Sequence, residues 1–224
     1  MIALALFSLK CSINISIPKS LKNSFTYCYN DKYTGIDTLI NIGGYYKEML
    51  IHKDHPFLDT CFHYFMFYDN GLFVYSIREI YYDDDKKEWI KKDVDSFLKN
   101  FAENAKSPGA NYFYDNNWGS YIICQDTIKV QKFYKGGSFN DGWHGTETWF
   151  TILDKNTILQ INSFNLPTDI VTVHKPTEKI IYPANFVLIP AKPKPNKSWI
   201  LKEKWFWCNE EDWKSYMDRI KTKE

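Results

Sequence analysis

The stretch WGSYIICQDTIKVQKFY, Trp118–Tyr134, decides the fold class of this chain. Two runs rich in aromatic and β-branched residues flank Gln125-Asp126-Thr127, and this pattern predicts two antiparallel strands joined by a tight turn. The second run alternates between apolar and polar positions, which is typical of a strand with one wet face. The first run is apolar on both sides, so we expect another part of the chain to cover its outer face.

The same hairpin pattern recurs along the chain. Asp69-Asn70-Gly71 lies between aromatic-rich runs within Thr60–Tyr82, and Asn-Gly supplies the positive-φ residues that a tight hairpin turn needs. A further hairpin is predicted over Thr146–Phe164, and single strands at Gly43–His52 and Asn185–Pro190. Short strands joined in sequence indicate an antiparallel meander. Such a meander avoids exposed edges most simply by closing into an up-and-down β-barrel, with a two-sheet sandwich as the alternative.

Two helices are expected in this mainly β chain. Apolar residues recur at spacings of three and four behind an acidic turn, which predicts an inserted amphipathic helix over about 86–105. Asn209 is a suitable N-cap for a C-terminal helix over 209–224. The segment 12–40 is weakly patterned and is interpreted as a lead-in and linker, which leaves 41–208 for the barrel.

The N-terminus suggests export. An apolar run from Ile2 to Leu9 directly precedes Cys11 and is similar to the end of a bacterial lipoprotein signal, in which the cysteine after the run carries lipid. Lys10 stands where such signals have a small residue, and no basic residue precedes the run. We expect residues 1–11 to be a truncated lipoprotein signal, Cys11 to be lipidated, and the protein to be periplasmic or anchored at the outer membrane. The alternative is a buried first strand or a frayed chain end.

Charge and cysteine usage exclude several classes of protein. The net charge is +1 with lysines and acids spread along the chain, so no nucleic-acid surface is indicated. None of the five cysteines forms a C-x-x-C pair, which argues against a zinc ribbon or a thioredoxin motif. No run approaches the ~20 apolar residues of a membrane-spanning helix.

Motifs for metal binding or catalysis are also lacking. The segment HKDHPFLDTCFH, 52–63, gathers metal-ligand residue types, but a strand and its adjoining loop are not expected to bring three or four of them to one point. The sequence has no G-x-S-x-G, no H-E-x-x-H and no phosphate-binding glycine loop. It therefore predicts no metal site, no cofactor and no enzyme. The loop Phe139–Glu147, with Trp and His beside glycines, is the best candidate for a ligand-contacting loop.

Aromatic content is the unusual feature of the composition. Rings make up 18% of the chain, with 16 Tyr, 16 Phe and 8 Trp. Such residues favour strands and would line a concave binding surface, although an AT-rich genome also enriches Phe and Tyr codons. A barrel of about eight strands has room either for its own side chains or for one small ligand. The sequence leaves both options open.

Four stretches carry a resemblance to a known family: GGYY at 43–46, FYDNG at 67–71, WGSYIICQDTIKVQ at 118–131, and FVLIP…W…KWFW within 186–207. They look like lipocalin-like (calycin-type) proteins of Bacteroidota, many of which are regarded as lipoproteins. The resemblance implies an eight-stranded barrel that binds a small apolar or amphipathic molecule at its mouth, with no catalytic residue. The lining residues expected from the strand centres are Tyr45, Phe65, Phe67, Tyr75, Tyr121, Trp149 and Phe164.

The sequence thus favours a non-enzymatic envelope protein that binds a small molecule. The alternative is a filled barrel that acts as a protein-interaction or structural component of the envelope. A third class, a hydrolase, would need a nucleophile and a base side by side, and no motif supplies them.

Overall fold

The structure is a computed structural model. It describes residues 16–52, 60–75, 80–83, 88–91, 96, 117–135, 142–166, 179–190 and 192–222. The predicted signal at 1–11, with Cys11, lies outside these residues, as do positions 139–141 of the loop that was expected to contact a ligand.

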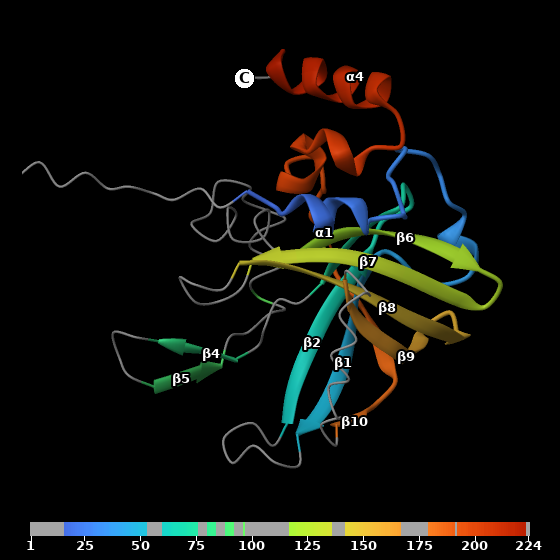
Figure 1. Cartoon of the computed structure of the whole chain (residues 1–224). Coiled ribbons are helices and arrows are strands. Elements are labelled where there is room, and N and C mark those ends of the chain that lie inside the picture. Colours follow the sequence, from blue (N-terminus) through green and yellow to red (C-terminus); the bar gives the residue numbers. More distant parts are fainter. Residues whose placement is uncertain are drawn as a thin grey trace, which may run out of the picture.

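A closed antiparallel barrel forms the body of the protein (Figure 1). Its strands are β1 (Gly44–His52), β2 (Thr60–Phe67), β3 (Leu72–Tyr75), β6 (Asn117–Cys124), β7 (Thr127–Lys135), β8 (Trp143–Asp154), β9 (Thr157–Leu166), β10 (Lys179–Ile181) and β11 (Ala184–Leu188). Their order is β10-β1-β11-β9-β8-β7-β6-β3-β2, and the additional β1–β2 pairing closes the wall. Strands β10 and β11 pair with successive parts of β1, so the barrel has eight strand positions. The predicted up-and-down barrel is confirmed, and the sandwich alternative is wrong.

Tight turns connect neighbouring strands at one end of the barrel. Gln125, in the β6–β7 turn, has φ 59°, and Gly71, in the β2–β3 turn, has φ 91°. These left-handed conformations help the chain to reverse within the two residues between β6 and β7 and the four residues between β2 and β3. The β8–β9 turn is Lys155–Asn156, within the hairpin predicted over Thr146–Phe164.

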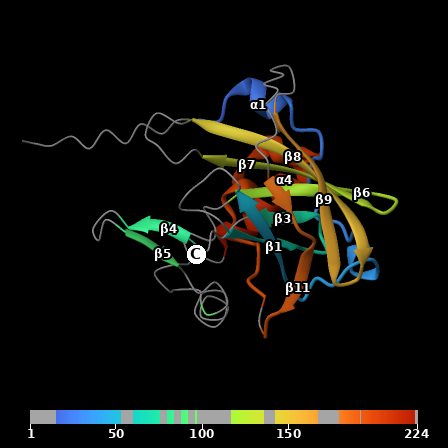
Figure 2. The same cartoon turned by 90° about the horizontal axis from the view of Figure 1, so that it is seen from below.

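The insertion between β3 and β6 differs from the prediction. Residues Ile80–Asp83 and Glu88–Lys91 form the antiparallel pair β4–β5, which lies apart from the barrel wall in both views (Figures 1 and 2). The first residues of the helix predicted over 86–105 therefore belong to a strand, because cross-strand pairing overrides a helical spacing of apolar residues. Ser96 is helical, and the rest of the predicted helix lies outside the described residues.

The C-terminal helix is confirmed. Helix α4 spans Glu210–Lys221, and the Asn209 side chain accepts a hydrogen bond from the Asp212 backbone N–H at 2.9 Å. This contact satisfies one of the free amides of the first turn, where Glu210, Glu211 and Asp212 also favour the helix dipole.

Both terminal segments cover one outer side of the wall (Figure 1). They contribute α1 (Lys19–Asn23) and the short turns η2 (Trp199–Lys202) and η3 (Lys204–Phe206), which lie below α4. Their rings pack on outward residues such as Trp118 and Phe133, which explains why β6 is apolar on both faces. A disulfide between Cys28 and Cys208 joins the two segments, and Tyr29 exchanges backbone hydrogen bonds with Phe206 and Cys208 beside it. The aromatic C-terminal segment therefore covers the outer wall instead of closing a barrel end.

Candidate binding site in the barrel interior

Aromatic side chains fill the half of the interior next to the tight turns. Inward residues from every part of the wall form one buried cluster, in which Phe65, Phe67, Phe73 and Phe150 have ring centroids 4.9–6.3 Å apart. The short turn η1 (Ile36–Thr38) closes this end, with Ile36 fully buried. This half of the barrel is therefore a core made of its own side chains.

The other half of the interior is polar. Strand register places Glu48 opposite His63, Tyr75 opposite Phe65, and Lys132 opposite Thr146. Because Tyr46 and Phe65 point inward and side chains alternate, the residues two positions further along also point inward. We call Glu48, His63, Tyr75, Lys132 and Thr146 the inner polar cluster; it draws on β1, β2, β3, β7 and β8.

Contacts link four members of the inner polar cluster. The Nδ1 atom of His63 lies 3.5 Å from Oε2 of Glu48 and forms a hydrogen bond with the Tyr75 hydroxyl. The Nζ atom of Lys132 lies over the Tyr75 ring, 2.9 Å from its centroid. Tyr75 also stacks on Phe65 at 6.0 Å, so the polar groups rest directly on the aromatic core.

Burial of the inner polar cluster costs folding free energy, because some of its polar groups lack hydrogen bonds among the described residues. Glu48 is 0% exposed, and neither of its oxygens has a hydrogen-bond partner within the part of the chain that the structure describes. The hydroxyl of Thr146 is buried and unpartnered in the same sense. Leaving such groups unpaired costs ~1–3 kcal/mol each. Burial also lowers the pKa of Lys132 well below its ordinary value, although the negative charge of Glu48 opposes this shift. Burial at this site therefore disfavours the charged form of the Lys132 amine.

Strand β9 is incompletely paired next to the cluster. It pairs with β11 only at Thr157 and Ile158, and from Leu159 onward its pairing among the described strands is with β8 alone. Ser163 and Asn165 face inward by register, opposite Thr148 and Thr146, yet both are exposed. Solvent therefore reaches the inner face of β9 at these two residues.

The seven residues predicted to line the site fall into two groups. Phe65, Phe67, Tyr75 and Tyr121 point into the barrel; Phe65 and Phe67 belong to the filled core, and Tyr121 donates a hydrogen bond to the Tyr68 carbonyl at 2.6 Å. Of these, Tyr75 is the one that lies in the inner polar cluster. Whether any of them contacts a ligand stays a prediction.

The other three predicted lining residues lie on the outer face of the wall. Tyr45 packs in the outer cluster beneath the terminal segments. Trp149 packs under Lys129 Nζ at 4.1 Å and against the Phe164 ring at 6.0 Å, and its indole N–H donates to Glu147 at 2.6 Å. Their predicted inward orientation is wrong. Side chains alternate between the two faces of a strand, so an inward position assigned one residue away places every side chain of that strand on the opposite face.

Sequence reasoning missed Glu48, Lys132 and Thr146. A signal was available for the first two: each is a charged residue at an inward position of a strand whose other inward residues are apolar, such as Tyr46 and Val130. Charged residues at inward positions are rare unless they have a role or a partner. The prediction selected aromatic residues as the lining of the site, whereas the residues that it missed are charged or polar.

Metal-ligand residue types do not converge in the described part of the chain, where no group of three or more His, Cys, Asp or Glu side chains could hold a metal ion. The segment 53–59, with His55 and Asp59, lies outside the described residues. Among the helices that the structure describes, none is long and apolar enough to cross a membrane.

Comparisons with protein-family models, with curated proteins and with solved structures find no match to this chain.

Proposed function

We propose that this protein is an exported, non-enzymatic, lipocalin-like barrel that binds a small amphipathic molecule at the inner polar cluster. The observation that supports this most is Glu48, whose carboxylate is fully buried inside the barrel, with neither oxygen hydrogen-bonded among the described residues and with His63 Nδ1 3.5 Å from Oε2. A protein that needed only a stable core would gain from an apolar residue at this position. A ligand that donates hydrogen bonds to Glu48 would offset the cost.

The surroundings of Glu48 favour a ligand with an apolar part. The aromatic core begins at Phe65 and Phe73, directly beside the polar groups, and Tyr75 presents its ring to the same space. A bound molecule would meet rings on one side and the Glu48, Lys132 and Thr146 groups on the other. This combination of apolar walls with a few polar groups is typical of small-molecule sites.

Export and lipid attachment at Cys11 belong to the same proposal. The Cys28–Cys208 disulfide supports export, because disulfides persist in oxidising compartments such as the periplasm. Alkylation of protein taken directly from its own cells tests this: Cys28 and Cys208 should resist alkylation until a reductant is added. Full alkylation without reductant would contradict export.

Binding can be tested with N-phenyl-1-naphthylamine, a neutral fluorescent probe with an apolar body and one N–H donor. We expect saturable binding, weakened about tenfold or more by Glu48→Met, since a hydrogen bond to a charged group contributes ~1.5–3 kcal/mol. Lys129→Met is the matched control for Lys132→Met, because both lysines lie on β7 over an aromatic ring, but Lys129 is on the outer face. Binding that is unaffected by both inner substitutions would contradict the site.

A filled barrel that binds a protein partner is the second candidate. The packed aromatic half of the interior favours it. Absence of probe binding to the native protein, with the fold intact by circular dichroism, would favour this candidate over the first.

A further inference from the structure

Lys132 is the least expected residue inside the barrel. Lysine almost never lies fully buried without a charged partner. The whole residue is 7% exposed, and within the described residues its Nζ has no carboxylate within 4.0 Å and no hydrogen bond; its contact is the face of the Tyr75 ring. An ammonium held this way would lack most of its solvation, so the amine is more stable uncharged.

Charge at the site restricts the polar group that a ligand can carry. Glu48 already places a carboxylate in the interior, and Lys132 feels its charge. A ligand carboxylate or phosphate would bring a second negative charge into the same low-dielectric space and would find no strong cation to pair with. A ligand with an uncharged polar group avoids this cost. Among uncharged polar groups, an aldehyde or ketone carbonyl is one that an uncharged amine attacks reversibly.

We infer that Lys132 forms a reversible imine with the aldehyde or ketone group of a small amphipathic ligand, beside Glu48 and Thr146. This inference rests on the proposed function, since it assigns the ligand class of the same interior site. In the first step the Nζ lone pair forms a bond to the carbonyl carbon, and a proton moves from nitrogen to the former carbonyl oxygen. In the second step that oxygen leaves as water with one further proton, and a C=N double bond remains. The sum is amine plus carbonyl to imine plus water, with no oxidation or reduction.

Other members of the inner polar cluster suit these proton movements. The Glu48 carboxylate and the His63 imidazole lie 3.5 Å apart and can accept and return a proton. The Thr146 hydroxyl, on the residue directly opposite Lys132, is a donor for the oxygen of the intermediate. The aliphatic part of the ligand would lie along the rings that border the cluster. Glu48, His63 and Thr146 act here as positioning and proton-transfer groups, and Lys132 as the nucleophile.

Reductive trapping tests the inference on the intact chain. The protein is incubated at pH 7.5 with a small excess of decanal and sodium cyanoborohydride, which reduces an imine to a stable secondary amine, and the modified lysine is found by peptide mass spectrometry. We expect one decyl group, on Lys132, added about tenfold faster or more than on any surface lysine. An ordinary lysine with a pKa near 10.4 is only ~0.1% uncharged at this pH and reacts slowly.

Three variants make the result specific. Lys132→Met and Lys132→Arg should abolish the fast adduct, and the second keeps a long polar side chain in case the first fails to fold. Lys129→Met should label as the native protein does, because it removes a lysine of the same strand from the outer face. Glu48→Gln should slow the labelling of Lys132 several-fold while leaving slow surface labelling unchanged.

The outcomes separate the inference from the proposed function. Labelling that is spread over surface lysines, or equal in Lys132→Met and native protein, overturns the imine. Binding of N-phenyl-1-naphthylamine that depends on Glu48, together with no fast adduct on Lys132, overturns the imine and keeps the interior binding site. Absence of both the probe binding and the fast adduct overturns the imine and the interior binding site together.

Discussion

Removal of the Cys28–Cys208 disulfide should destabilise the protein strongly. The bond closes a loop with a sequence separation of 180 residues. In the chain-entropy model, closing a loop of this length lowers the entropy of the unfolded state by about 18 cal/mol/K, which corresponds to about 5 kcal/mol at 25 °C. Because single domains of this kind have stabilities of ~5–15 kcal/mol, such a loss would be a large part of the total.

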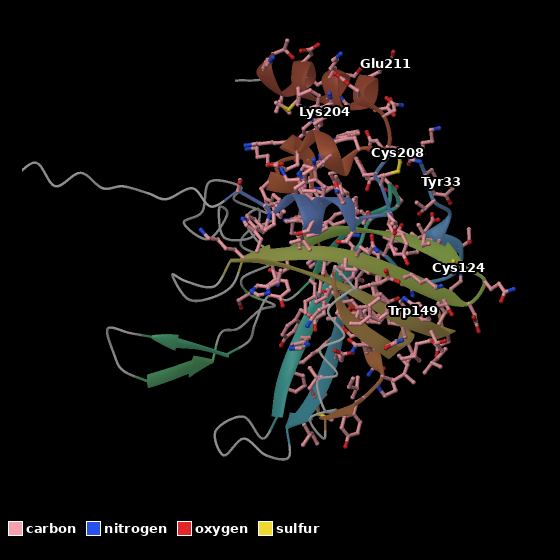
Figure 3. The ribbon with its side chains drawn as sticks, viewed as in Figure 1. Tyr33, Cys124, Trp149, Lys204, Cys208 and Glu211 are labelled. Atoms are coloured by element: carbon pink, nitrogen blue, oxygen red, sulfur yellow. A yellow bond between two sulfur atoms is a disulfide. The ribbon has the colours of Figure 1, made fainter. Side chains whose placement is uncertain are left out.

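Urea unfolding, followed by tryptophan fluorescence, measures this effect. The double variant Cys28→Ser/Cys208→Ser is compared with the oxidised native protein, and Cys124→Ser serves as the control, because Cys124 is a free exposed thiol at the β6–β7 turn (Figure 3). We expect a loss of about 3–5 kcal/mol for the double variant and less than about 0.5 kcal/mol for the control.

A loss below about 1 kcal/mol, with an unchanged denaturant slope, would refute this reasoning. It would mean that the terminal segments already constrain each other in the unfolded state, or that they detach before the barrel unfolds. The denaturant slope distinguishes the two, since early detachment lowers the surface exposed in the main transition.

Three further predictions follow from individual side chains. Glu48→Met should raise the free energy of unfolding by ~1–3 kcal/mol in urea while weakening probe binding about tenfold or more, because it removes a buried carboxylate that has no hydrogen bond among the described residues; a loss of stability would contradict the geometry of Glu48. Burial lowers the pKa of Lys192 to about 7. Between that pH and the ordinary lysine pKa, the unfolded state binds more protons than the folded state, so the free energy of unfolding rises with pH. In urea titrations at pH 7, 8 and 9, Lys192→Met should reduce the rise in the free energy of unfolding by up to ~1.4 kcal/mol per pH unit. Gly119→Ala should cost at least ~3 kcal/mol of thermal or urea stability, since its Cβ would lie 1.9 Å from the Gln131 carbonyl oxygen, whereas Gly142→Ala has open space and should change little.

Much of the barrel could be predicted because its signals are local. The Asn70-Gly71 turn and the N-cap at Asn209 each depend on a few neighbouring residues, and both are confirmed. The wet face expected from the alternation after Thr127 is wrong, because Gln131 and Phe133 on the outer face and Lys132 on the inner face are all buried. The β4–β5 pair was missed because Trp89 and Ile90 fit a helical stripe and a strand equally well within so short a window.

The site was harder to predict because it depends on register across strands. Glu48, His63 and Lys132 are far apart in the sequence and meet only after the wall has closed. The lining residues were chosen because they are aromatic. Tyr75 points inward as predicted, because the inward-facing positions of its strand were assigned correctly, whereas Trp149 points outward, because those of its strand were assigned one residue away. The partners of a buried charged side chain depend on the register between strands, so they cannot be predicted from the sequence of one strand alone.

The covering of one outer side by both chain ends has a consequence for biosynthesis. During synthesis the wall strands leave the ribosome before Ile200, Phe206 and Tyr216, which protect the outward rings of Tyr64 and Trp118. A nascent barrel would therefore expose an apolar aromatic surface until the last residues are made. Chains with such exposed surfaces are prone to aggregate during this interval. A chaperone that holds the polypeptide until its C-terminal segment emerges, or until Cys208 reaches Cys28, would therefore raise the yield of native protein.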